Sequence, residues 1–319
     1  MTLLKLVPRL LLAALIAGGG FAVDRRAASR EAIANAAYPP EGQLIEVDGH
    51  TVHAYVTGSG PDLVLIHGAS GNLRDFTFSL TAKLAPEYRV IAFDRPGLGW
   101  TDAIPDGDSP AAQATLLRHA ATQLGVTNPI VLGHSYGGAV AMAWALQAPD
   151  DTAALVLVSA ATMPWDGSIW WLHNVMGNPV GGYTVVPLVT AFAGNQTAED
   201  ATRNIFAPDP MPEGYLAHIG ADLTMRRASL RANSGQVAGL KPFIIAMSAQ
   251  YATLTLPVEL IHGDADTIVP LAVHAARLVT ILPNATLTVL SGVGHMPHHS
   301  NESDVIAAIT RAATRAGLR

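Results

Sequence analysis

The sequence predicts an α/β protein with a doubly wound, mostly parallel, eight-stranded sheet and an inserted helical cap. Short apolar runs rich in β-branched residues recur along the chain, and segments of helical period separate them. Runs this short are typical of parallel strands that are covered on both faces. Their alternation with helices favours a doubly wound sheet. One long stretch does not alternate, and this stretch predicts the cap.

The first two strands are expected at residues 43–47 and 51–56, where polar and apolar side chains alternate around the turn signal Asp48-Gly49. Six further strands are expected at residues 63–66, 90–93, 130–132, 155–158, 258–261 and 286–290. One helix between them should begin at Ser109-Pro110 and end before Gly125, because serine caps helix starts and glycine follows helix ends. The core of the fold therefore comprises residues 41–162 and 252–319.

The predicted cap covers residues 163–251, which show no clear strand and carry many prolines, glycines and large apolar side chains. A structureless loop of that length is implausible inside a compact domain, so the segment should be mostly helical. Its acidic and basic residues nearly cancel in number. The cap therefore indicates no preference for a charged substrate.

The N-terminus explains part of the apolar composition, which is 50% hydrophobic residues with a mean hydropathy of +0.29. Residues 1–23 combine a basic start with an apolar stretch at 10–23 and small residues near its end. This pattern predicts a secretory signal peptide or a single N-terminal membrane anchor, with membrane contact through residues 3–23. Either places the protein outside the cell or in its envelope. Residues 24–40 are expected to form a linker.

Composition also excludes several classes of protein. The net charge of −6 argues against nucleic-acid binding, which requires a basic surplus. The absence of cysteine excludes a disulfide-stabilised module, a cysteine-ligated metal and a cysteine nucleophile. His298 and His299 follow His295 closely, but the chain lacks an H-E-x-x-H motif. We therefore expect neither a metal nor a cofactor.

The strongest indication of a catalytic site is the G-x-S-x-G motif Gly133-His134-Ser135-Tyr136-Gly137, which lies between a predicted strand and a predicted helix. A serine on such a sharp turn exposes its hydroxyl at the sheet edge, and the helix N-terminus behind it favours negative charge. Serine is a weak nucleophile without a base and an orienting carboxylate. Histidine and aspartate candidates follow the last two strands, at the edge where ligands bind in open α/β sheets. They are His295, Asp264 and Asp266.

The chain order Ser135, Asp266, His295 resembles that of the α/β-hydrolases. The resemblance extends from Gln43 to the C-terminus, and the cap matches least well. It implies a Ser-His-Asp triad in which Asp266 rather than Asp264 is the acid, because Gly263-x-x-Asp266 fits the acid loop of that family.

Two further loops carry the resemblance. The segment His67-Gly68-Ala69-Ser70-Gly71 resembles the oxyanion loop of the family, which implies that the backbone N–H groups of Ala69 and Tyr136 form the oxyanion hole. The turn that begins at Asp94 resembles the D-x-P-G-x-G-x-S turn of the family, which is structural.

The resemblance implies a serine hydrolase that cleaves carboxylic esters of apolar small molecules through an acyl-enzyme, without a cofactor. Candidate substrate-pocket residues are Ser70, Trp170, Trp171 and Met296. Serine at position 135 argues against epoxide hydrolases and haloalkane dehalogenases, which have aspartate there. Cleavage of a carbon–carbon bond, a lactone or an amide on the same framework is the alternative, although carbon–carbon hydrolases usually have tryptophan at position 296. A non-catalytic ligand sensor with this fold is the alternative from another class.

Overall fold

The structure is a computed structural model that describes residues 3–168 and 170–319, with side chains from Gly18 onward except at position 195. Eight strands form one sheet in the order β1-β2-β4-β3-β5-β6-β7-β8. Their bounds are Gln43–Val47, His50–Thr57, Asp62–Ile66, Arg89–Phe93, Ile130–His134, Ala154–Val158, Val258–Gly263 and Ala285–Leu290 for β1 to β8. Strand β2 is antiparallel to both neighbours, and β3 to β8 are parallel. The predicted strands and the mostly parallel sheet are confirmed.

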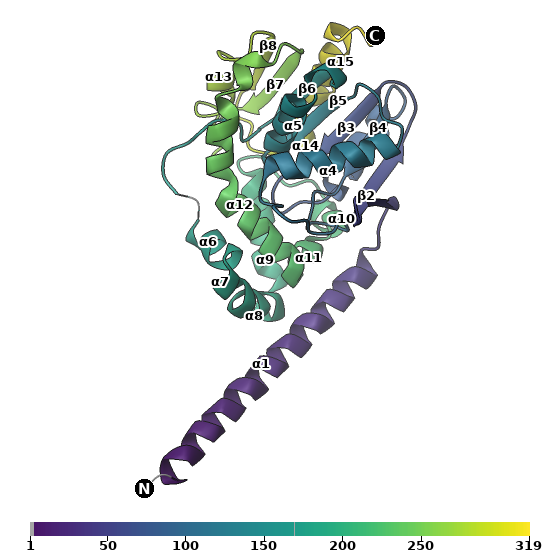
Figure 1. Cartoon of the computed structure of the whole chain (residues 1–319). Helices are drawn as coiled ribbons and strands as arrows, with labels where there is room; N and C mark the ends of the chain where they lie inside the picture. Colours follow the sequence, from purple (N-terminus) through teal and green to yellow (C-terminus); the bar gives the residue numbers. More distant parts are fainter. Residues whose placement is uncertain (1–2, 169) are drawn as a thin grey trace.

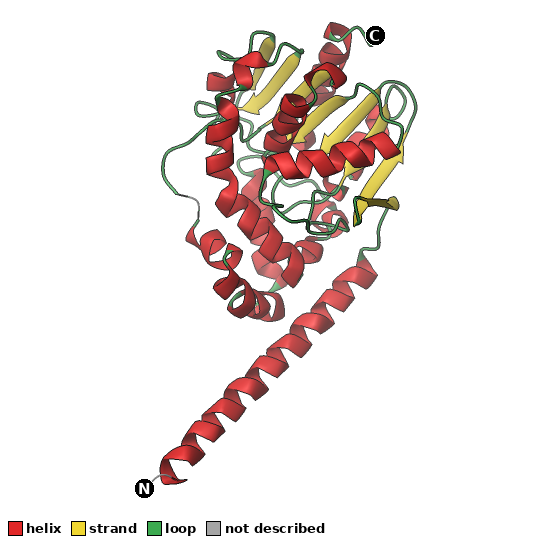
Figure 2. Ribbon diagram, in the orientation of Figure 1, coloured by secondary structure: helices red, strands yellow, loops and turns green. Residues whose placement is uncertain are grey.

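Helices cover both faces of this sheet (Figure 2). One face packs against α4 (Pro110–Gln123) and α5 (Tyr136–Gln147), and the other against α2 (Arg74–Thr77), α3 (Leu80–Leu84) and α15 (Glu302–Arg315). Two short helices, α13 (Ala275–Leu278) and α14 (Pro297–Ser300), follow β7 and β8. Ser109 caps α4 as predicted, because its side chain accepts a hydrogen bond from the N–H of Ala112. Two apolar layers therefore enclose strands such as β5 and β6, which are buried along their whole length.

A set of helices between β6 and β7 forms the inserted cap that the sequence predicts (Figure 1). They are α6 (Trp171–Gly177), α7 (Pro179–Thr184), α8 (Val186–Phe192), α9 (Asn195–Phe206), α10 (Tyr215–Ile219), α11 (Ala221–Thr224) and α12 (Arg227–Ser248). Within the described residues, no strand lies between β6 and β7. The longest of these helices, α12, also contacts α5 of the core.

His274 fixes the point where the chain leaves the core for the cap. Its Nδ1 accepts hydrogen bonds from the backbone N–H groups of Thr162 and Met163, at 3.2 and 3.1 Å. Burial and the neighbouring His262 lower the pKa of His274 to about 4. The imidazole is therefore neutral in the folded protein at neutral pH, as an acceptor nitrogen requires.

We expect the stability of the protein to fall on acidification through His274. Its pKa is near 6.5 in the unfolded chain and about 4 in the folded one, so the unfolded chain binds the extra proton as the pH falls through this range. Between pH 6.5 and 4.5 this histidine alone should lower the free energy of unfolding by about 2 kcal/mol. Urea denaturation of wild type and His274→Asn at both pH values measures the effect. An equal loss of stability between pH 6.5 and 4.5 in both proteins would contradict the role of His274.

The N-terminal helix α1 (Leu3–Ala37) differs from the sequence prediction. Residues 24–37, predicted as part of a linker, continue the helix, because alanine, arginine and glutamate favour helix and no proline follows Pro8 until Pro39. No helix in the described part of the chain has the length and apolarity needed to cross a membrane.

The second half of α1 is held against the cap, while its N-terminal half extends beyond the body of the protein (Figure 1). Arg227 donates two hydrogen bonds to one carboxylate oxygen of Glu31 and one to the other, at 2.7 to 2.8 Å. The side-chain hydrogen bond from Arg227 outweighs burial and lowers the pKa of Glu31. Ala27 and Ala34 are buried on the same side of the helix. The second half of α1 is therefore docked on the cap.

Candidate active site

Ser135 lies on a strained turn between β5 and α5. Its backbone angles are φ 53° and ψ −119°, outside the regions that L-residues usually occupy. The turn needs glycine on both sides of the serine. A Cβ on Gly133 would lie 2.3 Å from the carbonyl oxygen of Gly137, and one on Gly137 would lie 2.1 Å from that of Ile66. The motif therefore folds into the sharp elbow that the sequence predicts.

Asp266 and His295 are brought together from the loops after β7 and β8. His295 Nδ1 donates a 2.7 Å hydrogen bond to Asp266 Oδ2, which leaves Nε2 of the imidazole as the basic nitrogen. The other oxygen of Asp266 accepts the backbone N–H groups of Ile268 and Val269, both at 2.9 Å. Burial alone would raise the pKa of Asp266, but hydrogen bonds from His262 and His295 hold it well below its usual value. The carboxylate therefore stays ionised.

The two aspartates of the acid loop occupy different environments. Asp264 is exposed, and its Oδ1 accepts a hydrogen bond from the backbone N–H of Gly292. Asp266 is buried and contacts His295. The geometry thus favours Asp266 as the partner of the base, as the family resemblance implies.

His134 connects the serine turn to His295, the predicted base. Its Nε2 donates to the backbone carbonyl of His295 at 3.0 Å, and the two rings lie 4.9 Å apart. Burial, together with the neighbouring His298 and His295, lowers the pKa of His134 well below its usual value. Among the described residues, no hydrogen bond joins Ser135 Oγ to His295. Catalytic hydrogen bonds of this kind are often long without substrate and tighten when it binds.

The two predicted oxyanion donors sit on either side of the same turn. A Cβ on Gly68 would lie 3.1 Å from Ser135 Cβ, so the loop that carries Ala69 passes directly over the serine. Tyr136 is the first residue of α5, where a backbone N–H has no partner within the helix. In the part of the chain that the structure describes, neither N–H donates a hydrogen bond. Both remain available to an oxygen bound beside Ser135.

A sequence profile of the α/β hydrolase fold family matches residues 61–302, which is more than half of the chain. The chain belongs to this family.

Relatives of this α/β hydrolase include proteins with different names and functions. An uncharacterised protein of Mycobacterium tuberculosis is 28% identical over 289 residues, which cover 86% of this chain and 81% of the relative. A 2-hydroxy-6-oxononadienedioate/2-hydroxy-6-oxononatrienedioate hydrolase of a Pseudomonas species is 27% identical, over 78% of this chain and 87% of the relative. These relatives and the family match identify the chain as a hydrolase.

Solved structures share the fold. A thermophilic esterase from Thermogutta terrifontis superposes with a TM-score of 0.71 at 21% identity and covers 86% of this chain and 99% of that one. A membrane phospholipase A described as a bacterial virulence factor superposes with a TM-score of 0.68 at 20% identity. This similarity covers 98% of this chain and 99% of the phospholipase. The second similarity therefore takes in most of α1 as well as the hydrolase core.

Arg95 supports the predicted oxyanion loop and was not singled out from the sequence. Its fully buried guanidinium donates to the carbonyl oxygens of His67 and Gly68 at 2.9 and 3.0 Å. It also donates to side-chain oxygens of Gln113 on α4 and Gln236 on α12. One cation thus joins the oxyanion loop, the core and the cap.

Arg95 also contacts the side chain of Tyr136, the residue whose backbone N–H is the second predicted oxyanion donor. Its guanidinium carbon is 4.2 Å from the centre of the Tyr136 ring. Burial lowers the pKa of Arg95 to about 10, so it remains charged at neutral pH, and no carboxylate among the described residues forms an ion pair with it. The only indication in the sequence that Arg95 could support this loop was the presence of a basic residue in the turn that begins at Asp94.

Replacing Arg95 should affect both stability and turnover. In Arg95→Met the carbonyls of His67 and Gly68 lose buried donors, which should lower the free energy of unfolding by about 3 kcal/mol. Because the loop then holds Ala69 less firmly, kcat should fall about 10- to 100-fold with little change in KM. Arg118→Met, on the outer side of α4, is the matched control and should leave both quantities unchanged. A normal kcat in a folded Arg95→Met protein would contradict the positioning role.

The predicted pocket residues separate into two groups. Ser70 is held by the cap, because its N–H donates to Asn233 Oδ1 at 2.6 Å and its carbonyl accepts from Thr224. Met296, next to the base, is buried in an apolar cluster between cap and core that includes Phe206. These two residues stay pocket candidates.

Trp170 and Trp171 do not fit the predicted pocket. They are 60% and 64% exposed, because they stand at the start of α6 on the outer side of the cap. Their large apolar surface therefore faces solvent rather than an enclosed site.

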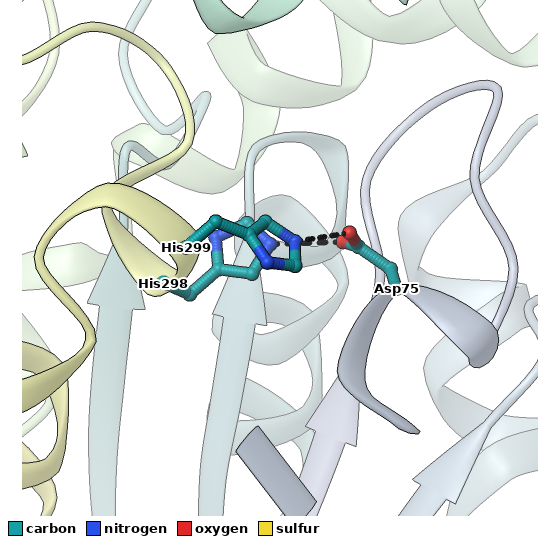
Figure 3. Close-up of side chains that lie close together, drawn as sticks. All are labelled: Asp75, His298 and His299. Carbon is teal, nitrogen blue, oxygen red and sulfur yellow. Dashed lines mark hydrogen bonds and ion pairs between the residues drawn. The ribbon is translucent and has the colours of Figure 1, made fainter. Parts of the chain in front are cut away.

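A buried Asp-His-His cluster lies behind the base and is the one group of potential metal ligands found among the described residues (Figure 3). Asp75 Oδ2 is 3.0 Å from His298 Nε2, and its Oδ1 is 2.8 Å from His299 Nε2. Tyr215 of the cap donates a further 2.7 Å hydrogen bond to Oδ1. These are hydrogen-bond distances, with each imidazole directed at its own carboxylate oxygen.

A metal at this cluster would also require a partner for the opposite ring nitrogen of each histidine. His298 Nδ1 is buried and has none among the described residues. Burial lowers the pKa of His298, and its Nε2 faces Asp75 Oδ2 at 3.0 Å. The cluster therefore supports a structural hydrogen-bond network that ties α2, α14 and the cap together.

Proposed function

We propose that this α/β hydrolase cleaves carboxylic esters of apolar small molecules, with Ser135 as nucleophile, His295 as general base and Asp266 as its orienting carboxylate. The proposal depends chiefly on the 2.7 Å hydrogen bond between His295 and the buried Asp266, beside a serine on a strained elbow. The Thermogutta protein, an esterase of the same fold, is consistent with it.

The steps follow from the arrangement of these groups. His295 Nε2 removes the proton from Ser135 Oγ as this oxygen attacks the ester carbonyl carbon, and Asp266 stabilises the imidazolium that forms. The N–H groups of Ala69 and Tyr136 stabilise the oxyanion, each by about 3–4 kcal/mol. The imidazolium then protonates the departing alcohol, which leaves an acyl-enzyme. Water, activated by the same histidine, releases the acid and restores the serine.

Carbon–carbon bond hydrolysis is the second candidate reaction, because a relative that is 27% identical to this chain is named a hydrolase of 2-hydroxy-6-oxononadienedioate, a compound without an ester group. Met296 occupies the position after the base, and its side chain lies in an apolar cluster with Phe206 and Ile219. This favours an apolar ester over the charged substrate in the name of that relative.

A substrate panel tests the proposal on the full chain. Short and medium-chain p-nitrophenyl esters, a lactone, an anilide and a ring-cleavage dienone should be compared by kcat/KM. We expect the esters to be hydrolysed fastest. Faster cleavage of the dienone would replace the ester assignment, and saturable binding of the esters without any turnover would identify a ligand sensor instead.

We also propose that the protein is exported or bound to the cell envelope through residues 3–23. The basic start and apolar stretch of the N-terminus support this location. The phospholipase of similar fold is described as a membrane enzyme, and its similarity to this chain includes most of α1, which is consistent with the proposal.

A further inference from the structure

A groove between α1 and the cap carries a concentration of positive charge. Its volume is about 730 Å³, and its lining includes Arg25, Arg26, Ser29, Arg30, Ile33 and Phe192. Three guanidinium groups on two successive turns of one helix are unusual in a chain whose net charge is −6. An anion entering the groove would therefore meet a local potential opposite in sign to the charge of the whole protein.

The acidic residues nearby do not neutralise this charge. Among the described residues, the one carboxylate that forms an ion pair with these arginines is that of Asp222, 4.0 Å from a terminal nitrogen of Arg30. Glu31 and Asp24, the other acids on this part of α1, both pair with Arg227. The groove thus retains an excess of positive charge.

Two of the three arginines are fixed in place by the end of α8. Arg26 Nε donates to the carbonyl of Ala191 at 2.7 Å, and Arg30 Nη1 donates to that of Ala193 at 2.5 Å. A guanidinium has five N–H donors, so each keeps several that these bonds do not use. Arg25 is exposed and makes no hydrogen bond or ion pair with any described residue. Together they present oriented donors of the kind that bind phosphate.

Exposed apolar side chains lie on the helices that form this edge of the cap, and two of them, Ile33 and Phe192, line the groove. Those more than 45% exposed on α1, α7 and α8 are Phe21, Ile33, Val180, Tyr183, Leu188 and Phe192. Arg26 lies over the ring of Phe192, with its guanidinium carbon 5.3 Å from the ring centre. Aromatic and apolar side chains beside arginines are typical of surfaces that rest at the boundary between lipid headgroups and acyl chains.

The direction of α1 identifies which occupant fits this surface. The N-terminal half of α1 projects past α7 and α8 (Figure 1), so the apolar stretch at 10–23 extends beyond this edge of the cap on the same helix that carries the three arginines. We propose that the groove binds the phosphate of an anionic phospholipid headgroup and docks the cap edge formed by α7 and α8 on a bilayer. This proposal depends on the groove and not on the ester chemistry, so either can fail alone.

Vesicle flotation of the full chain tests the site. Wild type should bind vesicles of phosphatidylcholine with 30% phosphatidylglycerol more tightly than vesicles of phosphatidylcholine alone, and added salt should remove the difference. Each basic residue near such a surface strengthens binding about five-fold, so Arg25→Gln should weaken binding to the anionic vesicles by about that factor. Binding to the neutral vesicles should not change. Arg118→Gln, on α4, carries the same change of charge away from the groove and should behave as wild type.

A label reports whether the cap itself reaches the lipid. Because the chain has no cysteine, Tyr183→Cys can carry a single environment-sensitive fluorophore on α7, and Asp150→Cys can carry it beyond α5 as a control. Anionic vesicles should shift the emission of the first label to the blue and leave the second unchanged.

Four results would overturn the proposal. They are equal binding to both kinds of vesicle, equal loss in both glutamine variants, no spectral shift at position 183, and a change in oligomeric state of Arg25→Gln without vesicles, which would identify an interface between copies. Binding of inorganic phosphate distinguishes a lipid headgroup from a soluble phosphate as the ligand of the groove. Saturable binding of inorganic phosphate by the wild type, without any preference for anionic vesicles, would identify a site for a soluble anion.

Discussion

Ser135→Ala should lower kcat for ester hydrolysis by about 10⁶-fold, the largest effect expected of any single substitution in this protein. The hydroxyl is the group that forms the acyl-enzyme, and the oxyanion donors alone preserve only a small residual rate. Removal of the hydroxyl takes away no hydrogen bond with His295, since none joins the two groups among the described residues. The thermal midpoint of the variant should therefore stay close to that of wild type.

Ser159→Ala is the matched control for this substitution. Ser159 follows the neighbouring strand β6, is fully buried, and its hydroxyl has no hydrogen-bond partner among the described residues. Its loss should leave kcat within about two-fold of wild type, because no buried partner is left unpaired. Substantial activity in a folded Ser135→Ala protein would show that another group attacks the ester.

The second large effect is expected at the acid. Asp266→Asn should lower kcat about 10⁴-fold, because an amide no longer holds the proton of His295 on Nδ1 and no longer stabilises the imidazolium. Asp264→Asn makes the same change two residues away on an exposed side chain, and it should retain most of the activity. Measuring kcat for one p-nitrophenyl ester with both variants tests these two expectations.

The pair also tests the assignment of the acid. If Asp264→Asn were the inactive variant and Asp266→Asn the active one, the 2.7 Å contact between Asp266 and His295 would have to be structural. Circular dichroism of Asp266→Asn is needed as well, because Ile268 and Val269 donate to the other oxygen of this carboxylate. The amide oxygen can still accept those bonds, so the fold should survive.

The positions of the strands and of the serine elbow could be predicted because they depend on local patterns. Apolar runs such as residues 63–66 have the length and composition of buried strands, and Gly133 and Gly137 allow contacts that no other residue permits. The proximity of Asp266 and His295 followed from chain order and from the common edge at which parallel strands end.

What could not be predicted depends on packing between distant segments. The role of Arg95 requires Gln236 of the cap and Gln113 of α4 to lie beside the oxyanion loop, and nothing local to the Asp94 turn indicates either. Trp171 was expected in the pocket for its size, but hydrophobicity alone does not tell the inner side of a cap from its outer side. Local composition favours a helix at residues 24–37, but the docking of this helix on the cap depends on Arg227, which lies far away in the sequence.

The central claim is that Ser135 is the nucleophile, and site mapping of a covalent probe tests it most directly. The full chain should be treated with a fluorophosphonate, digested and examined by mass spectrometry. We predict one adduct per chain, on the peptide that contains Ser135, formed at a rate that an ester substrate slows by competition. An adduct on a different serine, or no adduct from a preparation that hydrolyses esters, would contradict this claim.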